Sequence, residues 1–145
     1  MEVLELKENQ IDVDTYLKLR DSVGWKKLTR AQAQAALDGS LYTVGVYVAG
    51  QPVGMGRLVG DGAVICYIQD LIVHPLVQGH GAGHMLMERL IARAGEMTAD
   101  GTEMMLDLMC AKGREAFYAQ HGFLARPTDS LGPGMIRYLD KRHRP

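Results

Sequence analysis

The run from Leu41 to Pro75 most constrains the fold of this chain, because its apolar residues follow the pattern of strands and not of a helix. Val, Ile and Tyr recur through the run, and the turn sequences AGQP and GDG interrupt it. β-Branched and aromatic residues favour strands, and short Gly-rich interruptions favour the turns that join antiparallel neighbours. The sequence therefore predicts three consecutive antiparallel strands, at residues 41–49, 53–60 and 63–73.

The remaining predicted elements surround these three strands. In chain order they are a strand at 3–6, helices at 11–23 and 30–39, a helix at 81–95, a strand at 104–110, a short helix at 113–121, and closing strands at 123–127 and 134–140. Thr29 is the expected N-cap of the second helix. Because strands and helices do not alternate as βαβ units, the order predicts an α+β fold with a mixed sheet.

Composition excludes several classes of protein. The 145 residues show no repeat or linker, which predicts a single domain over 1–145. The formal net charge is −1, so nothing global favours a nucleic-acid partner, and no apolar run reaches the ~20 residues that span a bilayer. Without a signal-peptide pattern, and with Cys66 and Cys110 in apolar surroundings, we expect a cytoplasmic protein with reduced thiols and no metal.

The segment QGHGAG, residues 78–83, stands between a predicted strand and a predicted helix. It does not fit the dinucleotide fingerprint G-x-G-x-x-G, because the third glycine would fall at His84, and it lacks the Lys-Ser/Thr pair of a Walker loop. A simple turn with spare glycines is one interpretation. The other is a backbone cradle for an anion, since glycines let successive N–H groups converge at a helix N-terminus.

The second interpretation matches a known family. QGHGAG, after a strand that ends VHP, is similar to Q/R-x-x-G-x-G/A, the acetyl-CoA loop of the GNAT N-acetyltransferases. AFYAQHGF at 116–123 resembles the family's FYxxxGF segment, one helix and one strand farther along. The chain resembles the GNAT family over about residues 41–139. The resemblance implies a three-layer fold, in which helices flank a central mixed, mostly antiparallel sheet.

The resemblance also implies acetyl-CoA as co-substrate and no metal. Strand residues would pair with the pantetheine arm, and loop residues would surround the pyrophosphate. The implied contacts are Leu71, Ile72 and Val73 on the strand, and Gln78, Gly79, His80, Gly81, Ala82, Gly83 and His84 in the loop. Ala111 stands where many relatives carry an Asn that contacts the cofactor, so one contact is lost.

Members of the family transfer the acetyl group by direct attack of an amine within a ternary complex. Tyr118 matches the tyrosine assigned as general acid, and a phenol with a pKa near 10 can protonate a thiolate leaving group. The general base is less clear. Asp70 is the first candidate for the base, with a structural carboxylate as the alternative, and Asp107 is the second candidate.

The acceptor side is the least defined. Trp25 and Arg126 are tentative substrate contacts, with a core aromatic and a loop salt bridge as the respective alternatives. The sequence thus predicts an acetyl-CoA-dependent N-acetyltransferase acting on an amine of a small molecule or peptide. The rival prediction is a non-catalytic acyl-CoA-binding sensor on the same fold. Homodimerisation is common in the family and is expected here only on that ground.

Overall fold

The computed structural model of the chain describes residues 3–142. The chain divides into two compact units, one up to Met109 and the other from Cys110 onward. No helix among the described residues is both long and apolar enough to cross a bilayer.

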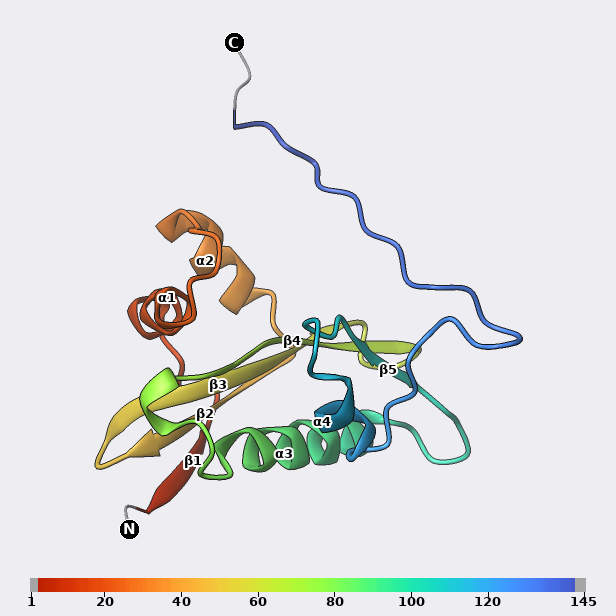
Figure 1. Cartoon of the computed structure of the whole chain (residues 1–145), viewed down its shortest axis with the longest axis horizontal. Coiled ribbons are helices and arrows are strands. Elements are labelled where there is room, and N and C mark those ends of the chain that lie inside the picture. Colours follow the sequence, from red (N-terminus) through yellow and green to blue (C-terminus); the bar gives the residue numbers. More distant parts are fainter. Residues whose placement is uncertain (1–2, 143–145) are drawn as a thin grey trace. The chain divides into compact units, whose positions relative to one another are not determined.

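A five-stranded sheet forms the centre of the first unit (Figure 1). Its strands are β1 (Leu4–Glu8), β2 (Tyr42–Val48), β3 (Gln51–Gly60), β4 (Ile65–Val73) and β5 (Met105–Leu108), in the order β1-β2-β3-β4-β5. All neighbours are antiparallel except β4 and β5, which are parallel. The predicted α+β class with a mixed, mostly antiparallel sheet is confirmed, as are the three consecutive strands.

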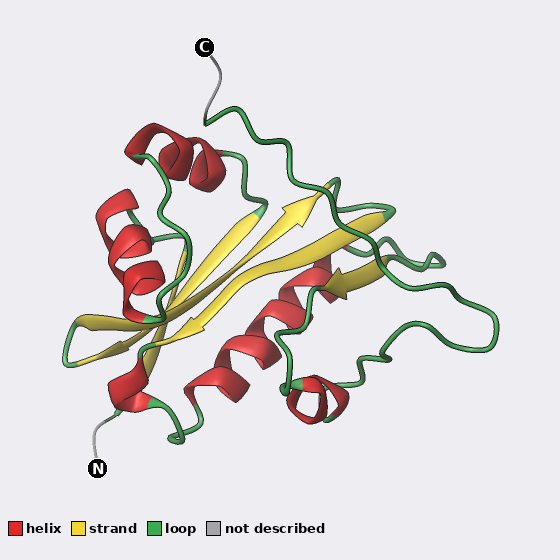
Figure 2. Cartoon of the chain, turned by 45° about the horizontal axis from the view of Figure 1, so that its top comes forward, coloured by secondary structure: helices red, strands yellow, loops and turns green. Residues whose placement is uncertain are grey.

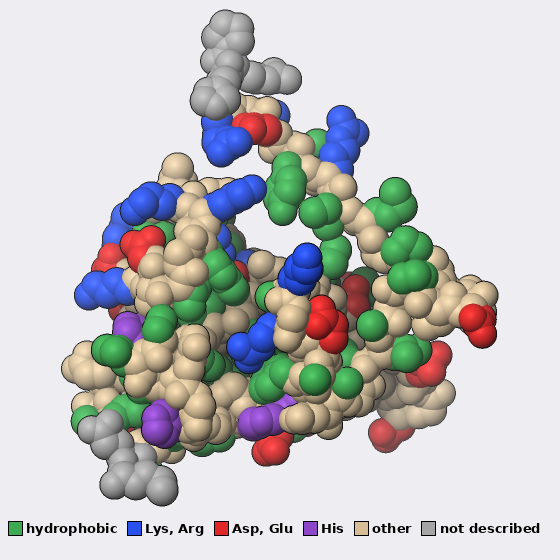
Figure 3. Space-filling view, viewed as in Figure 1, with side chains coloured by type: hydrophobic (Ala, Val, Ile, Leu, Met, Phe, Trp, Pro, Cys, Tyr) green, Lys and Arg blue, Asp and Glu red, His purple; other side chains and the backbone are tan. Residues whose placement is uncertain are grey.

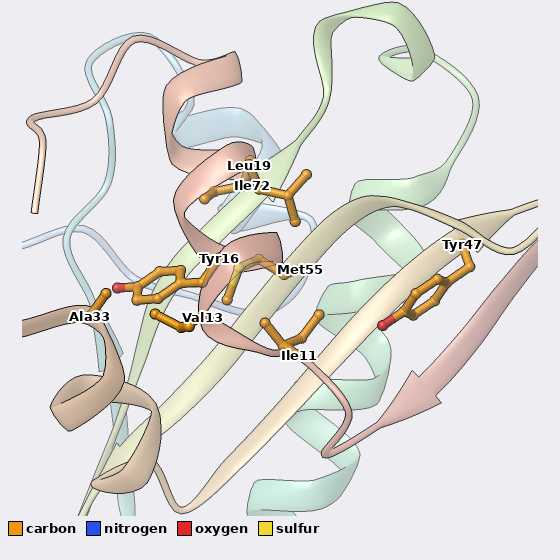
Figure 4. Close-up of a cluster of buried hydrophobic side chains, with 8 residues drawn as sticks. All are labelled: Ile11, Val13, Tyr16, Leu19, Ala33, Tyr47, Met55 and Ile72. Carbon is orange, nitrogen blue, oxygen red and sulfur yellow. The ribbon is translucent and has the colours of Figure 1, made fainter. Parts of the chain in front are cut away.

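Helices cover both faces of this sheet (Figure 2). On one face lie α1 (Val13–Ser22), capped by Asp12, and α2 (Arg30–Asp38), whose N-terminus carries a capping box built on Thr29. Buried side chains of this helical layer and of strands β2, β3 and β4 form one cluster, which Figure 4 shows: Ile11, Val13, Tyr16, Leu19, Ala33, Tyr47, Met55 and Ile72.

The helix α3 (Ala82–Met97) lies against the other face, and glycines in β3 let it approach closely. A Cβ atom at Gly56 would stand 2.7 Å from Cδ1 of Leu90, and one at Gly54 would stand 3.3 Å from Cδ1 of Leu86. The predicted helix at 81–95 and its place after β4 are therefore confirmed.

One irregularity in β4 positions the candidate site. Met55 pairs with Ile72 and Arg57 pairs with Gln69, so Gly56 alone opposes two residues, Asp70 and Leu71. This extra residue is a β-bulge, and Asp70 adopts φ 55°, a left-handed conformation that is uncommon for a residue with a side chain. The bulge changes the side-chain alternation of β4 where the strand approaches its end.

The second unit departs from prediction. Its only helix among the described residues is α4 (Glu115–Ala119), preceded by the turn at Gly113, and the predicted closing strands at 123–127 and 134–140 are wrong. A strand needs a neighbour for its backbone groups, and the described part of this unit contains no other strand. Apolar side chains of the segment stay exposed instead, with Met135 at 88% and Leu139 at 82%.

Candidate active site

The loop between β4 and α3 has the geometry of an anion cradle. A short 3₁₀ turn (Pro75–Val77) follows β4, and Gly79 and Gly81 then adopt φ 85° and 88°. Both values lie in the left-handed region that favours glycine. Gly81 is the N-cap of α3 and, having no side chain, makes no capping hydrogen bond to the first turn. Backbone N–H groups at the positive end of a 16-residue helix can thus receive an anion.

Two side chains form hydrogen bonds at the β4 end of this loop. Nε2 of Gln78 donates to the carbonyl oxygen of Val73 at 3.0 Å, and Nδ1 of His74 accepts from the backbone N–H of Leu76 at 3.1 Å. The structure therefore brings the predicted loop residues 78–84 together at the start of α3. A Cβ atom at Gly79 or Gly81 would meet nothing within 4 Å, so it is their φ angles, and not local crowding, that favour glycine there.

Asp70 lies at the centre of a buried polar cluster that joins α1 to the sheet. Its side chain is 0% exposed. The hydroxyl of Tyr16 and Nε of Arg57 donate to Oδ2, the latter at 2.8 Å. Nη1 of Arg20 donates to Oδ1 at 2.8 Å, and Nε2 of Gln69 approaches the same oxygen at 3.4 Å. Both carboxylate oxygens of Asp70 are therefore occupied.

The two arginines extend this cluster to the rest of the helical layer. Arg57 also donates to the carbonyl oxygen of Ala36 and to the hydroxyl of Ser40, at the end of α2. Arg20 donates to the carbonyl oxygen of Lys26 in the loop between the helices. Burial, followed by the hydrogen bond to Asp70, raises the pKa of the Tyr16 phenol. The cluster thus fixes the helical layer to the bulge in β4.

Sequence reasoning missed Tyr16, Arg20 and Arg57. The one available signal was Arg57, a charged residue within an apolar strand run, because a buried guanidinium requires a carboxylate partner.

Asp107 on β5 has a contrasting environment. It pairs with Tyr67 in the parallel register of β4 and β5. Its Oδ1 atom is buried and has no hydrogen-bond partner among the described residues. Burial raises the pKa of this carboxyl group, and a hydrogen bond from its own backbone N–H opposes that rise only in part.

The predicted acceptor contact Trp25 follows α1 and is 38% exposed, so it does not fill the core. Its ring stands 5.4 Å from the guanidinium of Arg20. Lys and Arg side chains gather over α1 and α2 (Figure 3). Beside them lies a hollow of about 130 Å³, lined by Leu17, Arg20, Asp21, Lys26, Lys27 and Leu28.

The other predicted residues belong to the second unit. Tyr118 lies on α4, where its ring meets Phe117 edge-on at 5.1 Å and Phe123 at 6.2 Å between centroids. Nε of Arg126 donates to the carbonyl oxygen of Gly132, which holds the loop that follows. Among the described residues, no three His, Cys, Asp or Glu side chains group as a metal site.

Known proteins resemble this chain in sequence and in fold. The family described as "Acetyltransferase (GNAT) domain" matches residues 42–124. An uncharacterised ycf52-like N-acetyltransferase from Prochlorococcus marinus is 30% identical over 121 residues, covering 81% of this chain and 65% of that protein. A chloroplastic serotonin N-acetyltransferase from Oryza sativa is 46% identical over 44 residues, which are 30% of this chain and 22% of that protein.

A solved structure extends the likeness to nearly the whole chain. The GNAT-family acetyltransferase from Streptococcus pneumoniae superposes with a TM-score of 0.80 at 27% identity, covering 96% of this chain and 100% of that one. The chain spans less than two thirds of the length of the two curated relatives above.

Proposed function

This chain belongs to the GNAT acetyltransferase family, and on that premise we propose that it moves the acetyl group of acetyl-CoA to an amine of a small molecule or peptide. The observation that carries the proposal is the start of α3. Gly79 and Gly81 adopt left-handed backbone at this point, and Gly81, the N-cap of α3, has no side chain that could bind the first-turn N–H groups. Such a helix terminus favours a phosphate group.

In this proposal the donor lies along the end of β4. Leu71, Ile72 and Val73 pair with the pantetheine arm as a further strand would, and residues 78–84 surround the pyrophosphate. The bulge at Asp70 supports this arrangement, because it interrupts the regular ladder just before the segment that would pair with the cofactor. A backbone N–H of the same segment would polarise the thioester carbonyl.

We assign Tyr118 as the general acid that protonates the thiolate of coenzyme A. Tyr118→Phe removes the proton donor and keeps the ring that packs on Phe117 and Phe123. We expect kcat to fall about 100-fold, since positioned acids contribute roughly 10²–10⁴-fold. Thiol release from acetyl-CoA measures kcat, and a calorimetric titration with acetyl-CoA should give a Kd within about threefold of wild type.

The matched control for this variant is Phe117→Leu, which changes the neighbouring ring and leaves the phenol in place. An equal loss of kcat in both variants would contradict the role of Tyr118, because packing would then explain the defect.

The acceptor is proposed only as a class. A named relative acts on serotonin, and its similarity covers 44 residues of this chain, so serotonin is a suitable first probe. The hollow beside Trp25, with Arg20 and two lysines among its lining residues, is the proposed acceptor contact on the helical layer. Arg126 remains a predicted second contact. A cytoplasmic location and a homodimer likewise remain predictions.

One observation favours the rival function, a non-catalytic acyl-CoA sensor. The predicted base Asp70 is buried, and both its oxygens already accept hydrogen bonds from cations or a phenol. A sensor would bind acetyl-CoA and release no thiol with any amine, and Tyr118→Phe would then change nothing that the assay measures.

A further inference from the structure

Resting on the proposed acetyl transfer, we propose that Asp107 on β5 is the general base for the acceptor amine, and that it acts through water. Asp70 then serves as the anchor of the bulge in β4 and not as the base. The inference rests on the contrast between these two carboxylates, which lie on the same face of the sheet.

Strand register places both carboxylates on the face that α1 and α2 cover. Arg57 contacts Ala36 and Ser40 at the end of α2, so its register partner Gln69 lies on that face as well. Side chains alternate along a strand, and Tyr67 therefore shares the face with Gln69. Asp107 pairs with Tyr67 in register, so the side chain of Asp107 lies on this face as well.

Of the two carboxylates, only Asp107 has an oxygen atom without a hydrogen-bond partner among the described residues. Asp70 accepts from Tyr16, Arg20 and Arg57, so proton transfer to it must first break a buried contact. Oδ1 of Asp107 is buried without any hydrogen-bond partner among the described residues. An unsatisfied buried acceptor is costly, and such atoms are retained at sites that bind water or substrate.

The groups that face Asp107 leave its carboxylate available as a base. Tyr67 shares the face of Asp107, and Cys66 is its neighbour on β4 with its side chain on the other face. Burial raises the pKa of both groups and the charge of Asp107 adds to that rise, so both are neutral at pH 7. No cation of the first unit lowers the pKa of Asp107, which burial raises. A raised carboxyl pKa makes the carboxylate a stronger base.

Distance along the strand requires water between the base and the amine. Asp107 is level with Tyr67, four residues before Leu71, and a strand rises about 3.3 Å per residue, which gives roughly 13 Å. Each hydrogen-bonded step covers about 2.8 Å, so a chain of about four waters spans that gap once the acceptor amine stands beside the thioester.

The proton and electron balance is simple. The ammonium group of the acceptor loses one proton through water to Asp107, and the neutral nitrogen attacks the thioester carbonyl carbon. The C–N bond forms and the C–S bond breaks. The departing thiolate takes up the second proton that the nitrogen releases, and Asp107 returns its proton to solvent.

Asp107→Asn tests the inference, because it removes the base and keeps the shape of the side chain. The acceptor is the most active amine among serotonin, a lysine peptide and glucosamine 6-phosphate, with acetyl-CoA as donor. We expect kcat to fall about 100-fold at pH 7 with the Kd for acetyl-CoA unchanged. The wild-type to variant ratio should shrink at least tenfold by pH 9.5, where far more of the amine is already neutral.

A second readout separates catalysis from structure. Burial makes the pKa of Asp107 higher in the folded state than in the unfolded state. The ionised carboxylate therefore lowers the free energy of unfolding at a pH above the folded-state pKa, and this effect disappears at a pH below the unfolded-state pKa. Asp107→Asn should thus leave the Tm at pH 7 equal to that of wild type or higher. A structural carboxylate would give a lower Tm.

Three outcomes divide the possibilities. Absence of any wild-type turnover defeats the proposed function, and the base assignment with it. An active wild type whose Asp107→Asn variant keeps its kcat, or keeps a constant ratio across pH, overturns only the present inference. The result that supports it is a pH-dependent loss without loss of Tm or of acetyl-CoA affinity.

Discussion

Asp70→Asn should lower the free energy of unfolding by about 3–5 kcal/mol, because it removes the charge that compensates two buried guanidinium groups. Arg20 and Arg57 both donate to this carboxylate, and their side chains are only 12% and 11% exposed. Neither guanidinium can turn to solvent without leaving the carbonyl oxygens of Lys26 and Ala36. Urea unfolding at low temperature, followed by circular dichroism, measures the change.

The matched control is Asp14→Asn. Asp14 also accepts a hydrogen bond from an arginine, Arg30, but both side chains are 64% exposed. An exposed pair contributes about 0–1 kcal/mol, so this variant should unfold close to wild type. Equal effects of the two substitutions would show that the buried cluster does not hold α1 on the sheet.

Gly81→Asp should weaken acetyl-CoA binding by about a thousandfold, equivalent to roughly 4 kcal/mol. The carboxylate would stand at the N-terminus of α3, where we place the pyrophosphate. It would compete for the first-turn N–H groups and repel the phosphates, and each lost charge-assisted hydrogen bond costs about 1.5–3 kcal/mol. Isothermal titration with acetyl-CoA gives the Kd.

Gly81→Asn isolates the charge, because Asn and Asp have nearly the same shape and both tolerate left-handed backbone. A Cβ atom at this position meets nothing within 4 Å, so both variants should fold. We expect Gly81→Asn to lose at most about tenfold in affinity. Equal Kd values for the two variants would place the pyrophosphate elsewhere.

The fold of the first unit was largely predictable because its signals are local. Strand-forming residues interrupted by short turn sequences predict β2, β3 and β4, and the capping residue Thr29 predicts the start of α2. The glycine loop was predictable for the same reason, since its conformation depends on a few adjacent residues. The closing strands were not, because their hydrogen bonds depend on a partner elsewhere in the chain, which no local pattern reveals.

The two candidate carboxylates were harder to tell apart for a related reason. Asp70 and Asp107 each interrupt a largely apolar strand run and look alike in the sequence. What distinguishes them is three donors that come from positions 13 to 54 residues away, and a bulge that turns Asp70 toward those donors. Side-chain partners at that separation become visible only in the folded chain.

Transfer of an acetyl group from acetyl-CoA to an amine is tested most directly by measuring the amounts of both products in one reaction. The wild-type chain is incubated with acetyl-CoA and serotonin, a lysine peptide or glucosamine 6-phosphate. We predict free thiol and N-acetylated amine in equal amounts for at least one acceptor, with saturable dependence on acetyl-CoA. Saturable acetyl-CoA binding without an acetylated product from any of these amines would contradict the claim and favour the sensor.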